Sequence, residues 1–355
     1  MNFQNYLAPY TEKINQFSED FFKDKISETE KITPLASQIW QEIKNFTNGG
    51  KKIRGGLVKI GFDSFSGKKA DKKLLPVSIA LELTHGAILI HDDIIDQSDF
   101  RHNQLTVHRQ FQKYHLDNYQ KGSASHYGES MAIVSGIIGY YAALSLIEKS
   151  SFPDSLKLKA IGQLAEFMVT TGYGEGIDID LPYHSEIKQD NVITIHTYKT
   201  AYYTFIGPLK VGAILAGAKE SDLKKFDEFG LPLGIAFQIQ DDILGIFGDE
   251  KKLGKPVCDD IREGKNTLLF TRVLEKGSSS QIKRIKELWG KKEINIKEIE
   301  EAREIIKGSG SLAYSQKLAN ELAAKSQKNI FKVTKDKNLQ EVYSSLSDFV
   351  VKREK

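Results

Sequence analysis

Apolar residues recur at helical spacing along most of the chain. Leu75, Ile79 and Leu83 lie one turn apart and lead into the largely apolar stretch 86–90. This spacing predicts a helix that keeps one apolar face. The same pattern predicts further helices over 156–171, 191–217, 222–246, 281–306 and 311–332.

Polar stretches separate the predicted helices, and alternating strand patterns are scarce. These stretches predict loops at 112–127, 182–190 and 248–266. We expect the loops beside acidic clusters to carry function. The Lys-rich end, 350–355, is expected to be a solvated tail. No repeat or low-complexity linker divides the chain, so the economical prediction is one all-α domain over residues 1–355.

One uncharged segment approaches the length of a membrane-spanning helix. No residue between Glu129 and Glu148 is charged. The segment nevertheless contains several serines, glycines and tyrosines, and nothing like it recurs in the chain. We therefore predict a buried core helix and no membrane span.

Two acidic clusters lie beside apolar stretches. The first, His-Asp-Asp-Ile-Ile-Asp at 91–96, follows the stretch 86–90, and the second, Asp241-Asp242, follows the stretch 231–237. Acidic residues are rarely placed inside apolar helices unless a cation meets them there. Two such clusters predict a hard metal ion that binds a polyanion.

The spacing within the first cluster suits magnesium. Asp92 and Asp96 are four residues apart, so their carboxylates share one face of a helix. They can bracket one or two divalent ions, and magnesium is the natural candidate because it favours oxygen ligands and diphosphate. Asp93 is expected to point aside and to support the ligands. A lone Asp-Asp pair is more often a solvated helix end, but the apolar flanks and the second cluster weaken that alternative.

Basic residues that suit a diphosphate are also present. Gly-Gly-Lys-Lys-Ile-Arg at 49–54 predicts a loop that enters a helix, where glycines allow close approach and the helix N-terminus favours an anion. Arg101 follows the first cluster, and Lys199 and Lys255 are further candidates. Any one of these is more often a solvated surface charge. Together with the aspartates they predict a site for two diphosphates.

Composition narrows the class of protein. The 40% apolar and 27% charged residues are ordinary for a soluble protein, and the net charge of +3 gives no reason to expect nucleic-acid binding. The single cysteine, Cys258, excludes an internal disulfide and fits a reducing compartment. The N-terminus lacks the basic start and apolar run of a secretory signal, so we expect a cytoplasmic protein.

The order of these motifs resembles the trans-isoprenyl diphosphate synthases, the polyprenyl synthetase family. The resemblance spans about residues 49 to 270, and its motifs are specific as a set. They are Gly-Gly-Lys-x-x-Arg (49–54), a His that precedes His-Asp-Asp-x-x-Asp (85–96), Gly-x-x-x-Asp (174–178), Lys-Thr (199–200), Phe-Gln-x-x-Asp-Asp (237–242), Gly-Lys-Pro (254–256) and Gly-Lys-x-Thr-Leu (264–268).

The resemblance implies a fold and a reaction. The fold is an all-helical isoprenoid-synthase-type bundle around a deep central cavity, usually in a homodimer. The activity is that of a prenyltransferase, which elongates an allylic diphosphate with isopentenyl diphosphate and uses magnesium, by analogy three ions per active site. Metals and cations would draw charge into the leaving diphosphate, and the apolar helices would exclude water from the carbocation.

The resemblance also implies roles for individual residues, carried over by position. Magnesium ligands would be Asp92, Asp96 and Asp241, with Asp93 and Asp242 completing the two metal clusters. The cationic clamp on the allylic diphosphate would be Arg101, Lys199 and Lys255, with help from Lys265. The isopentenyl diphosphate site would use Lys51, Arg54 and His85, with His102 beside them. The Thr200 carbonyl and the Gln238 side chain would stabilise the carbocation.

The chain departs from the family pattern at several positions. Gly245 replaces the third Asp of the second cluster, which predicts surviving activity with altered surroundings of the metal. His102 stands where a second Arg normally follows Arg101, and it is neutral for much of the time near pH 7, so we expect weaker or pH-dependent binding of isopentenyl diphosphate. The other departures are Asn103 for Gly, Ile137 for Asp, Glu175 for Gln, and the long 112–127 loop.

Product length is expected to depend on the helix that leads to the first cluster. The residue five before Asp92 is Ala87, with Ile88 next to it and Thr84 about one turn deeper. A small residue at 87 leaves room for a long chain, so we predict a product of twenty carbons or more, such as geranylgeranyl diphosphate. The alternative is that Ala87 only packs the helix and another wall residue, such as Met131 or Val134, sets the length.

Two other functions remain open from the sequence. A class I terpene cyclase shares the fold and the first cluster but needs no isopentenyl site, so Lys51, Arg54 and His85 argue against it. A non-catalytic or weakly active subunit of a heteromeric synthase would be expected to lose its metal clusters, whereas Asp92 and Asp241 are both present. The departures at positions 102, 137 and 245 keep this second alternative open.

Overall fold

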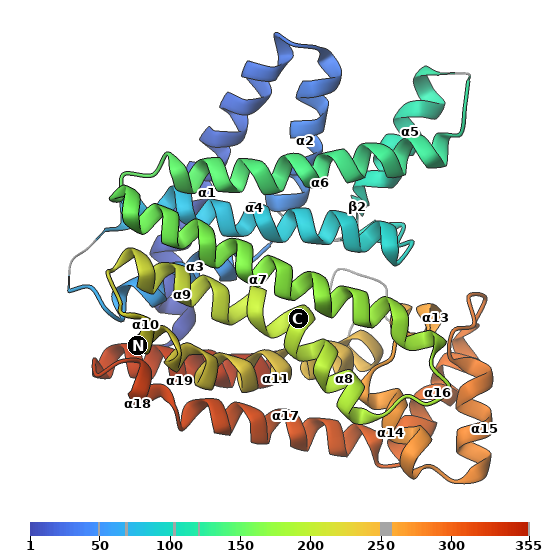
Figure 1. The fold of residues 1–355 in the computed structure, drawn as a ribbon. Helices are drawn as coiled ribbons and strands as arrows, with labels where there is room; N and C mark the ends of the chain where they lie inside the picture. Colours follow the sequence, from blue (N-terminus) through green and yellow to red (C-terminus); the bar gives the residue numbers. More distant parts are fainter. Residues whose placement is uncertain (49, 68–69, 102–103, 120, 249–257, 354–355) are drawn as a thin grey trace. The chain divides into compact units, whose positions relative to one another are not determined.

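The computed structural model describes residues 1–48, 50–67, 70–101, 104–119, 121–248 and 258–353. In these ranges the chain is almost entirely helical (Figure 1), which confirms the all-α prediction. The one sheet among the described residues is a hairpin in which Phe100 pairs with Leu105 and Arg101 with Gln104.

Contacts group the chain into two compact units. The N-terminal unit comprises residues 4–163 and 208–218, and the C-terminal unit comprises residues 1–3, 164–207 and 219–355. The prediction of a single domain over 1–355 stays a prediction.

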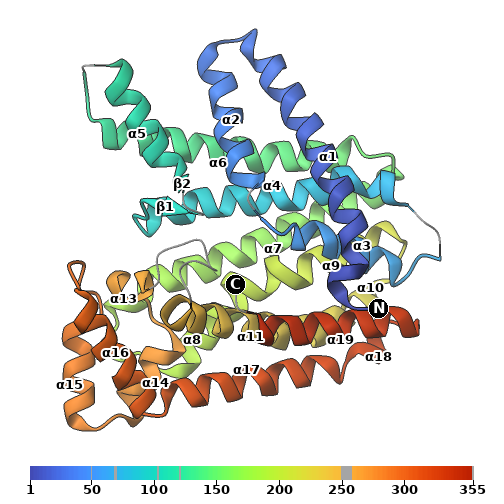
Figure 2. The same ribbon diagram turned by 180° about the vertical axis from the view of Figure 1, so that it is seen from behind.

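The N-terminal unit is built mainly from long helices. They pack so that α4 lies against α3 and α6, and α6 lies against α5 (Figures 1 and 2). The elements are α1 (Phe3–Glu30), α2 (Pro34–Asn48), α3 (Ile53–Asp63), α4 (Asp71–Ile95), β1 (Phe100–Arg101), β2 (Gln104–Leu105), α5 (Val107–Asn118) and α6 (Ala124–Glu148), together with most of α9 (Gly207–Leu215).

The C-terminal unit is centred on α11, which packs against η2, α17 and α19. Helix α7 starts in the N-terminal unit and continues into this one. The elements are α7 (Asp154–Asp180), the 3-10 turn η1 (Leu181–Tyr183), α8 (Gln189–Ile195), the π-helix η2 (His196–Ile206), α10 (Glu220–Leu223), α11 (Lys225–Phe247), α13 (Asp259–Glu263), α14 (Leu268–Lys276), α15 (Ser279–Leu288), α16 (Ile296–Gly308), α17 (Ser311–Gln327), α18 (Ile330–Val333) and α19 (Lys337–Lys352).

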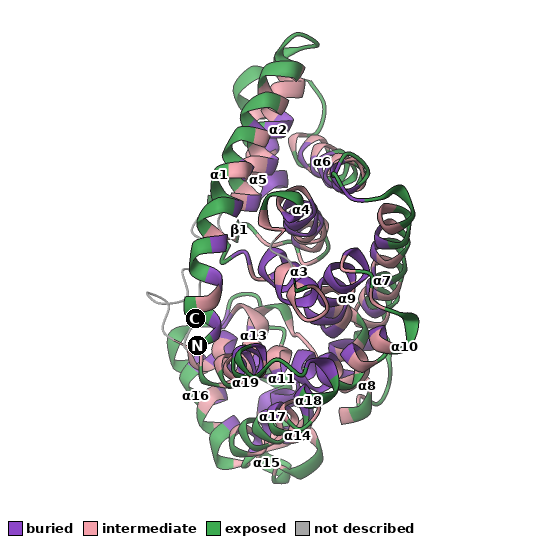
Figure 3. Cartoon of the chain, turned by 90° about the vertical axis from the view of Figure 1, so that its left-hand side faces the viewer, coloured by how far each residue is buried: buried purple, intermediate pink, exposed green. Residues whose placement is uncertain are grey.

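Two helices, α4 and α6, are long and apolar enough to cross a membrane by length and composition alone. Over its most apolar window α4 is 67% buried, whereas α6 is only 39% buried (Figure 3). Within the chain α6 therefore buries one side against α4 and α5 and exposes the other. The expectation of a buried core helix at this segment is correct for one side only.

Four other local predictions need correction. The predicted loop 248–266 contains a short helix, α13, in its described part. Helix α5 forms the first half of the predicted loop 112–127, because Val107, Phe111 and His115 recur one turn apart and are buried. The predicted helix 281–306 is two helices, α15 and α16, separated at Gly290, whose φ of 83° lies in the left-handed region. The predicted solvated tail is helical to Lys352.

Close glycine contacts fix α3 against α9 in the N-terminal unit. A Cβ added at Gly61 would overlap the Leu209 carbonyl oxygen, and one added at Gly212 would overlap the Val58 carbonyl oxygen. The two backbones can approach this closely only because neither glycine has a side chain.

We predict that Gly212→Ala lowers the free energy of unfolding by about 1–3 kcal/mol, because overpacking forces the two backbones apart. Gly162→Ala on α7 is the matched control. Its added methyl meets nothing within 4 Å, so the better helix propensity of alanine should raise stability by about 0.5–1 kcal/mol. Denaturant unfolding measures both changes, and equal stabilities of the two variants would contradict the close contact.

Candidate functional site

The first acidic cluster lies at the C-terminal end of α4. Asp92 and Asp93 are in its last turn, and Asp96 is the C-cap residue, whose backbone N–H donates to the Asp92 carbonyl oxygen. The C-terminal end of a helix carries a partial negative charge, which disfavours carboxylates and favours cations. No basic residue lies in the last turn of α4, so a cation must come from outside the helix.

Arg101 on β1 supplies one such cation. Its Nη2 lies 2.6 Å from Asp93 Oδ1 and 3.4 Å from Asp92 Oδ2, and its Nε donates to Asp93 Oδ1 at 2.8 Å. The Asp93 side chain is only 1% exposed. Burial raises the pKa of Asp93 to about 6, and the guanidinium of Arg101 opposes that rise. Asp93 is therefore the main partner of Arg101, and Asp92 makes only a longer contact with it.

The second acidic cluster lies near the C-terminal end of α11, and its two aspartates differ. Asp242 is buried; its Oδ1 accepts from Gln238 Nε2 at 2.9 Å, and its Oδ2 lies 3.2 Å from His196 Nε2. Asp241 is 41% exposed, and its Oδ1 lies 2.9 Å from Nη2 of Arg353. Asp241 is thus the more accessible carboxylate of the pair.

Arg353 is a residue that the sequence reasoning missed, since the end of the chain was expected to be a solvated tail. Its side chain is only 8% exposed. The guanidinium donates to the Phe237 carbonyl oxygen at 3.0 Å and lies 3.8 Å from the centre of the Phe237 ring. The amphipathic pattern of α19 marks the helix that leads to Arg353, but no local signal identifies Asp241 as its partner.

The π-helix η2 carries Lys199 and Thr200. Lys199 Nζ lies 2.8 Å from Asp178 and 3.0 Å from Glu175 on α7. The Thr200 hydroxyl donates to Gln238 Oε1 at 2.9 Å. Gln238 is therefore held at its oxygen by Thr200 and at its nitrogen by Asp242, and these two partners fix the orientation of its amide. π-Helical turns are rare in proteins, and where they occur they often lie at functional sites.

The basic loop before α3 lies in the N-terminal unit. Helix α3 begins at Ile53, which confirms the expected entry from loop to helix. Lys51 is exposed, Arg54 in the first turn is buried, and His85 on α4 is partly buried. Gly49 lies outside the described residues, as do His102 and Asn103 after Arg101 and Lys255 after the second cluster.

Lys265 follows α13 in the C-terminal unit. Its Nζ lies 3.1 Å from Glu263 and 3.8 Å from Asp260. Asp260 also lies against α11, because a Cβ added at Gly245 would overlap Asp260 Oδ2. The departure at Gly245 thus has a local physical reason: a carboxylate from α13 occupies the space of the missing side chain.

The three α4 residues predicted to set product length differ in burial and contacts. Ala87 is buried, and a Cβ added at Gly139 on α6 would lie 3.0 Å from its methyl group. The Thr84 hydroxyl donates to the Ala80 carbonyl oxygen, and Ile88 is partly buried. This contact supports the alternative in which Ala87 packs α4 against α6. The proposed wall residue Val134 is 44% exposed.

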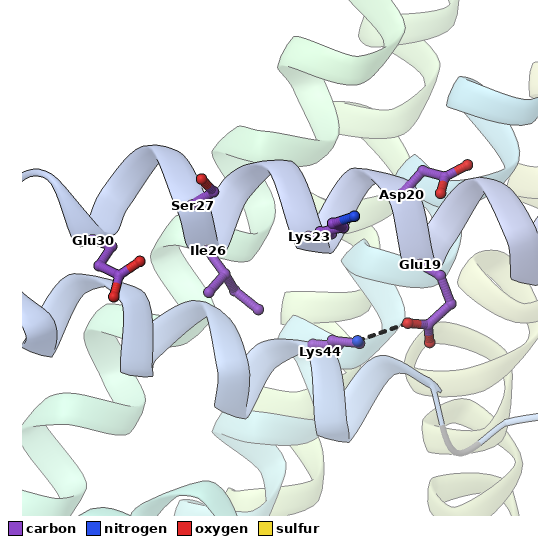
Figure 4. A pocket seen from close by; sticks show the side chains of 7 residues that line it. All are labelled: Glu19, Asp20, Lys23, Ile26, Ser27, Glu30 and Lys44. Atoms are coloured by element: carbon purple, nitrogen blue, oxygen red, sulfur yellow. Dashed lines mark ion pairs between the residues drawn. The ribbon is translucent and has the colours of Figure 1, made fainter.

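A cavity of about 370 Å³ lies between α1 and α2 (Figure 4). Its lining mixes acidic and basic side chains, two of which, Glu19 and Lys44, form an ion pair at 2.7 Å. None of the residues predicted for the site is among those that line it, which are Glu19, Asp20, Lys23, Ile26, Ser27, Glu30 and Lys44.

Each unit brings part of the predicted site together. In the N-terminal unit Asp92, Asp93 and Arg101 meet; in the C-terminal unit the contacts join Thr200, Gln238 and Asp242. Among the described residues no three Asp, Glu, His or Cys side chains converge closely enough to enclose a metal ion. The donor set is nevertheless all oxygen and lies at the negative ends of helices, which fits magnesium held partly by phosphate and water.

Comparison with known proteins shows the family to which the chain belongs. The polyprenyl synthetase family model matches residues 37–306. The chain is 30% identical over 357 residues to the geranylgeranyl diphosphate synthase of Sulfolobus acidocaldarius, with 99% of each chain covered. It is 32% identical over 307 residues to the short chain isoprenyl diphosphate synthase of Methanocaldococcus jannaschii, with 86% of each chain covered.

A solved structure has the same fold. A geranylgeranyl pyrophosphate synthase from Corynebacterium glutamicum, complexed with isoprenyl diphosphate and magnesium, superimposes with a TM-score of 0.89 at 27% identity. The match covers 97% of this chain and 99% of that one.

We predict that restoring an aspartate with Gly245→Asp destabilises the protein, because the new side chain overlaps the Asp260 carboxylate and adds a like charge beside it. Gly172→Asp on α7 is the control, since a Cβ there meets nothing within 4 Å. Thermal unfolding should show a loss of about 1–3 kcal/mol for Gly245→Asp beyond that of the control.

The double variant Gly245→Asp/Asp260→Ala should recover most of this loss. If Gly245→Asp unfolds at the same temperature as Gly172→Asp, the contact between Asp260 and position 245 does not limit the residue there.

Proposed function

Because the chain belongs to the polyprenyl synthetase family, we propose that it is a magnesium-dependent prenyltransferase that joins isopentenyl diphosphate to an allylic diphosphate. The observation that supports this proposal is the placement of Asp92 and Asp96 at the C-terminal end of α4 and of Asp241 in the C-terminal part of α11, all within the span of the family match. The named relatives are isoprenyl or geranylgeranyl diphosphate synthases over nearly the whole chain, so neither a cyclase nor a non-catalytic subunit is favoured. A product of twenty carbons is the corresponding expectation.

The residues proposed as magnesium ligands are Asp92, Asp96 and Asp241. When bound, magnesium would neutralise the leaving diphosphate and so favour ionisation of the allylic C–O bond. Asp93 and Asp242 support these ligands rather than reach the ion, because their carboxylates already face Arg101 and the pair Gln238 and His196. The magnesium complex of the C. glutamicum enzyme supports the choice of metal, and three ions per site is part of the proposal.

The basic residues would bind the two diphosphates. Arg101, Lys199 and Lys265 are assigned to the allylic diphosphate, as is Lys255, and Lys51, Arg54 and His85 to isopentenyl diphosphate. Lys199 is now paired with Glu175 and Asp178, both partly exposed. A diphosphate carries more negative charge than either carboxylate and would compete with both for the ammonium.

The condensation requires the allylic carbocation to be held close to the double bond of isopentenyl diphosphate. Heterolysis of the allylic C–O bond leaves a carbocation and diphosphate, and the isopentenyl double bond supplies the electron pair of the new C–C bond. Loss of a proton to a diphosphate oxygen completes the product. Gln238 would stabilise the cation through its oxygen, which Thr200 and Asp242 orient, together with the Thr200 carbonyl.

We further propose that the protein is a cytoplasmic homodimer with no membrane-spanning segment. The exposed side of α6 supports a dimer, because Ile133, Val134, Ile137 and Tyr141 are 46%, 44%, 45% and 70% exposed. An apolar face of this kind marks an interaction surface more often than a solvated one. Ile137, which departs from an aspartate of the family pattern, is part of this face.

We predict that the purified protein, given magnesium, labelled isopentenyl diphosphate and allylic primers of increasing length, forms products of defined length. Asp92→Asn should reduce kcat on the order of 10²–10³-fold, because a carboxylate that binds the metal is lost. Asp99→Asn is the control, since Asp99 lies nearby and pairs with Arg109 instead; its kcat should stay within about twofold of wild type. No turnover with any primer would refute the proposed function.

We predict that Ala87→Phe shortens the product if residue 87 borders the growing chain. The contact of Ala87 with Gly139 adds a stability loss of about 1–3 kcal/mol from overpacking. Chain-length analysis and thermal unfolding of the same sample separate the two effects. A destabilised variant with an unchanged product would show that Ala87 only packs α4 against α6.

A further inference from the structure

Lys52 has an unusual conformation in the loop before α3. It is the N-cap residue, with φ 53° and ψ 37° in the left-handed region, where a residue with a Cβ is disfavoured by roughly 1–2 kcal/mol. Its side chain is nevertheless 2% exposed, and its ammonium donates to the Thr47 carbonyl oxygen at 2.5 Å. Burial lowers the pKa of Lys52, and the carboxylate of Glu82 opposes that effect.

Glu82 on α4 supplies the cap that α3 lacks. It is 4% exposed, and its Oε1 accepts from the Gly55 backbone N–H at 2.7 Å. The first N–H groups of a helix have no acceptor within the helix, and no side chain of α3's own N-cap residue accepts from them. A buried carboxylate from a neighbouring helix therefore completes the first turn of α3 and also suits its positive end.

Other buried groups fix the same turn. The Ser78 hydroxyl donates to the Gly55 carbonyl oxygen at 2.9 Å, and the Tyr10 hydroxyl lies 2.8 Å from Ser78 Oγ. A Cβ added at Gly86 on α4 would lie 2.8 Å from Thr47 Oγ1, so α4 also approaches the end of α2 closely.

The position of Lys52 gives this network a consequence for binding. Lys52 lies between Lys51, which is exposed, and Arg54, which is in the first turn of α3. The left-handed turn at Lys52 directs its own side chain inward while the preceding lysine stays in solvent. His85 follows Glu82 by one turn on α4, so the residue that caps α3 also shares a helix face with the third basic residue.

We propose that Glu82 and Lys52 are positioning residues for the isopentenyl diphosphate site. They act through Lys51 and Arg54: Glu82 holds the first turn of α3, and the buried ammonium of Lys52 holds the preceding turn. The inference rests on the proposed function, in which Lys51, Arg54 and His85 bind that substrate. It predicts that loss of either residue weakens binding of isopentenyl diphosphate and leaves the allylic diphosphate unaffected.

The test measures both KM values for wild type, Glu82→Ala, Glu82→Gln and Lys52→Met. Glu82→Ala and Lys52→Met should raise the KM for isopentenyl diphosphate about tenfold or more, since small displacements of a binding group have large effects. The KM for the allylic diphosphate should change less than about twofold. Glu82→Gln keeps an oxygen acceptor for Gly55 and should restore most of the affinity.

Lys59→Met is the matched control. Lys59 is a second mostly buried lysine of the N-terminal unit, on α3 itself, and its ammonium lies 2.8 Å from Asp63 and 2.9 Å from Asp71. Its loss should lower the unfolding temperature without a selective change in the KM for isopentenyl diphosphate. If Lys59→Met shifts that KM as much as Lys52→Met does, the role of Lys52 is only structural and the inference is wrong.

The outcomes separate the inference from the proposed function. Turnover by wild type with both KM values rising equally in the Glu82 and Lys52 variants, or with neither rising, would overturn the inference alone. No turnover by wild type with any primer would overturn both. If Glu82→Ala does not fold, Glu82→Gln and Lys52→Met still decide the question through the ratio of the two KM values.

Discussion

A carboxylate at the carbonyl end of a helix needs a cation, and the candidate site in each unit depends on that constraint. Aspartates lie in the last turn and at the C-cap of α4, where the helix contributes about half a negative charge of its own. Asp241 and Asp242 lie in α11 more than one turn before its end at Phe247. Arg101 and Arg353 meet these aspartates from segments that lie outside the two helices. In each cluster an arginine from outside the helix thus offsets part of the carboxylate charge, and the same electrostatics suits the clusters to a divalent ion.

Exposure decides which of these ion pairs can be exchanged for a ligand. Removing a partner from a buried pair costs about 3–5 kcal/mol because an uncompensated charge remains, and Asp93 at 1% exposure is in that position. In the second cluster Asp241 is 41% exposed but its partner Arg353 is only 8% exposed, so this pair lies between the buried and the exposed case. Arg101 is consequently a lasting part of the first cluster, whereas in the second cluster the exposed carboxylate of Asp241 is the group that a metal ion can reach.

Local patterns in the sequence were enough to predict the helices, the acidic clusters and the loop that enters α3, because each depends on residues within a few turns. The partners were not predictable in this way. Arg353 and Asp241 are 112 residues apart, and the contact between Asp260 and Gly245 depends on how α13 returns to α11. The tail was misjudged because charged composition says nothing about whether an arginine finds a carboxylate and an aromatic ring. The 112–127 segment was misjudged because its buried residues are spaced among polar ones.

The two acidic clusters differ in the partners and exposure of their aspartates as well as in the number of aspartates. In the first, one aspartate is committed to Arg101, and Asp92 and Asp96 remain one turn apart on the same helix. In the second, Asp242 is an internal partner of Gln238 and leaves Asp241 as the accessible carboxylate. Position 245 cannot provide another, since the carboxylate of Asp260 fills that space. The second cluster therefore lacks its third aspartate along the chain, but Asp260 keeps an acidic group beside it in space.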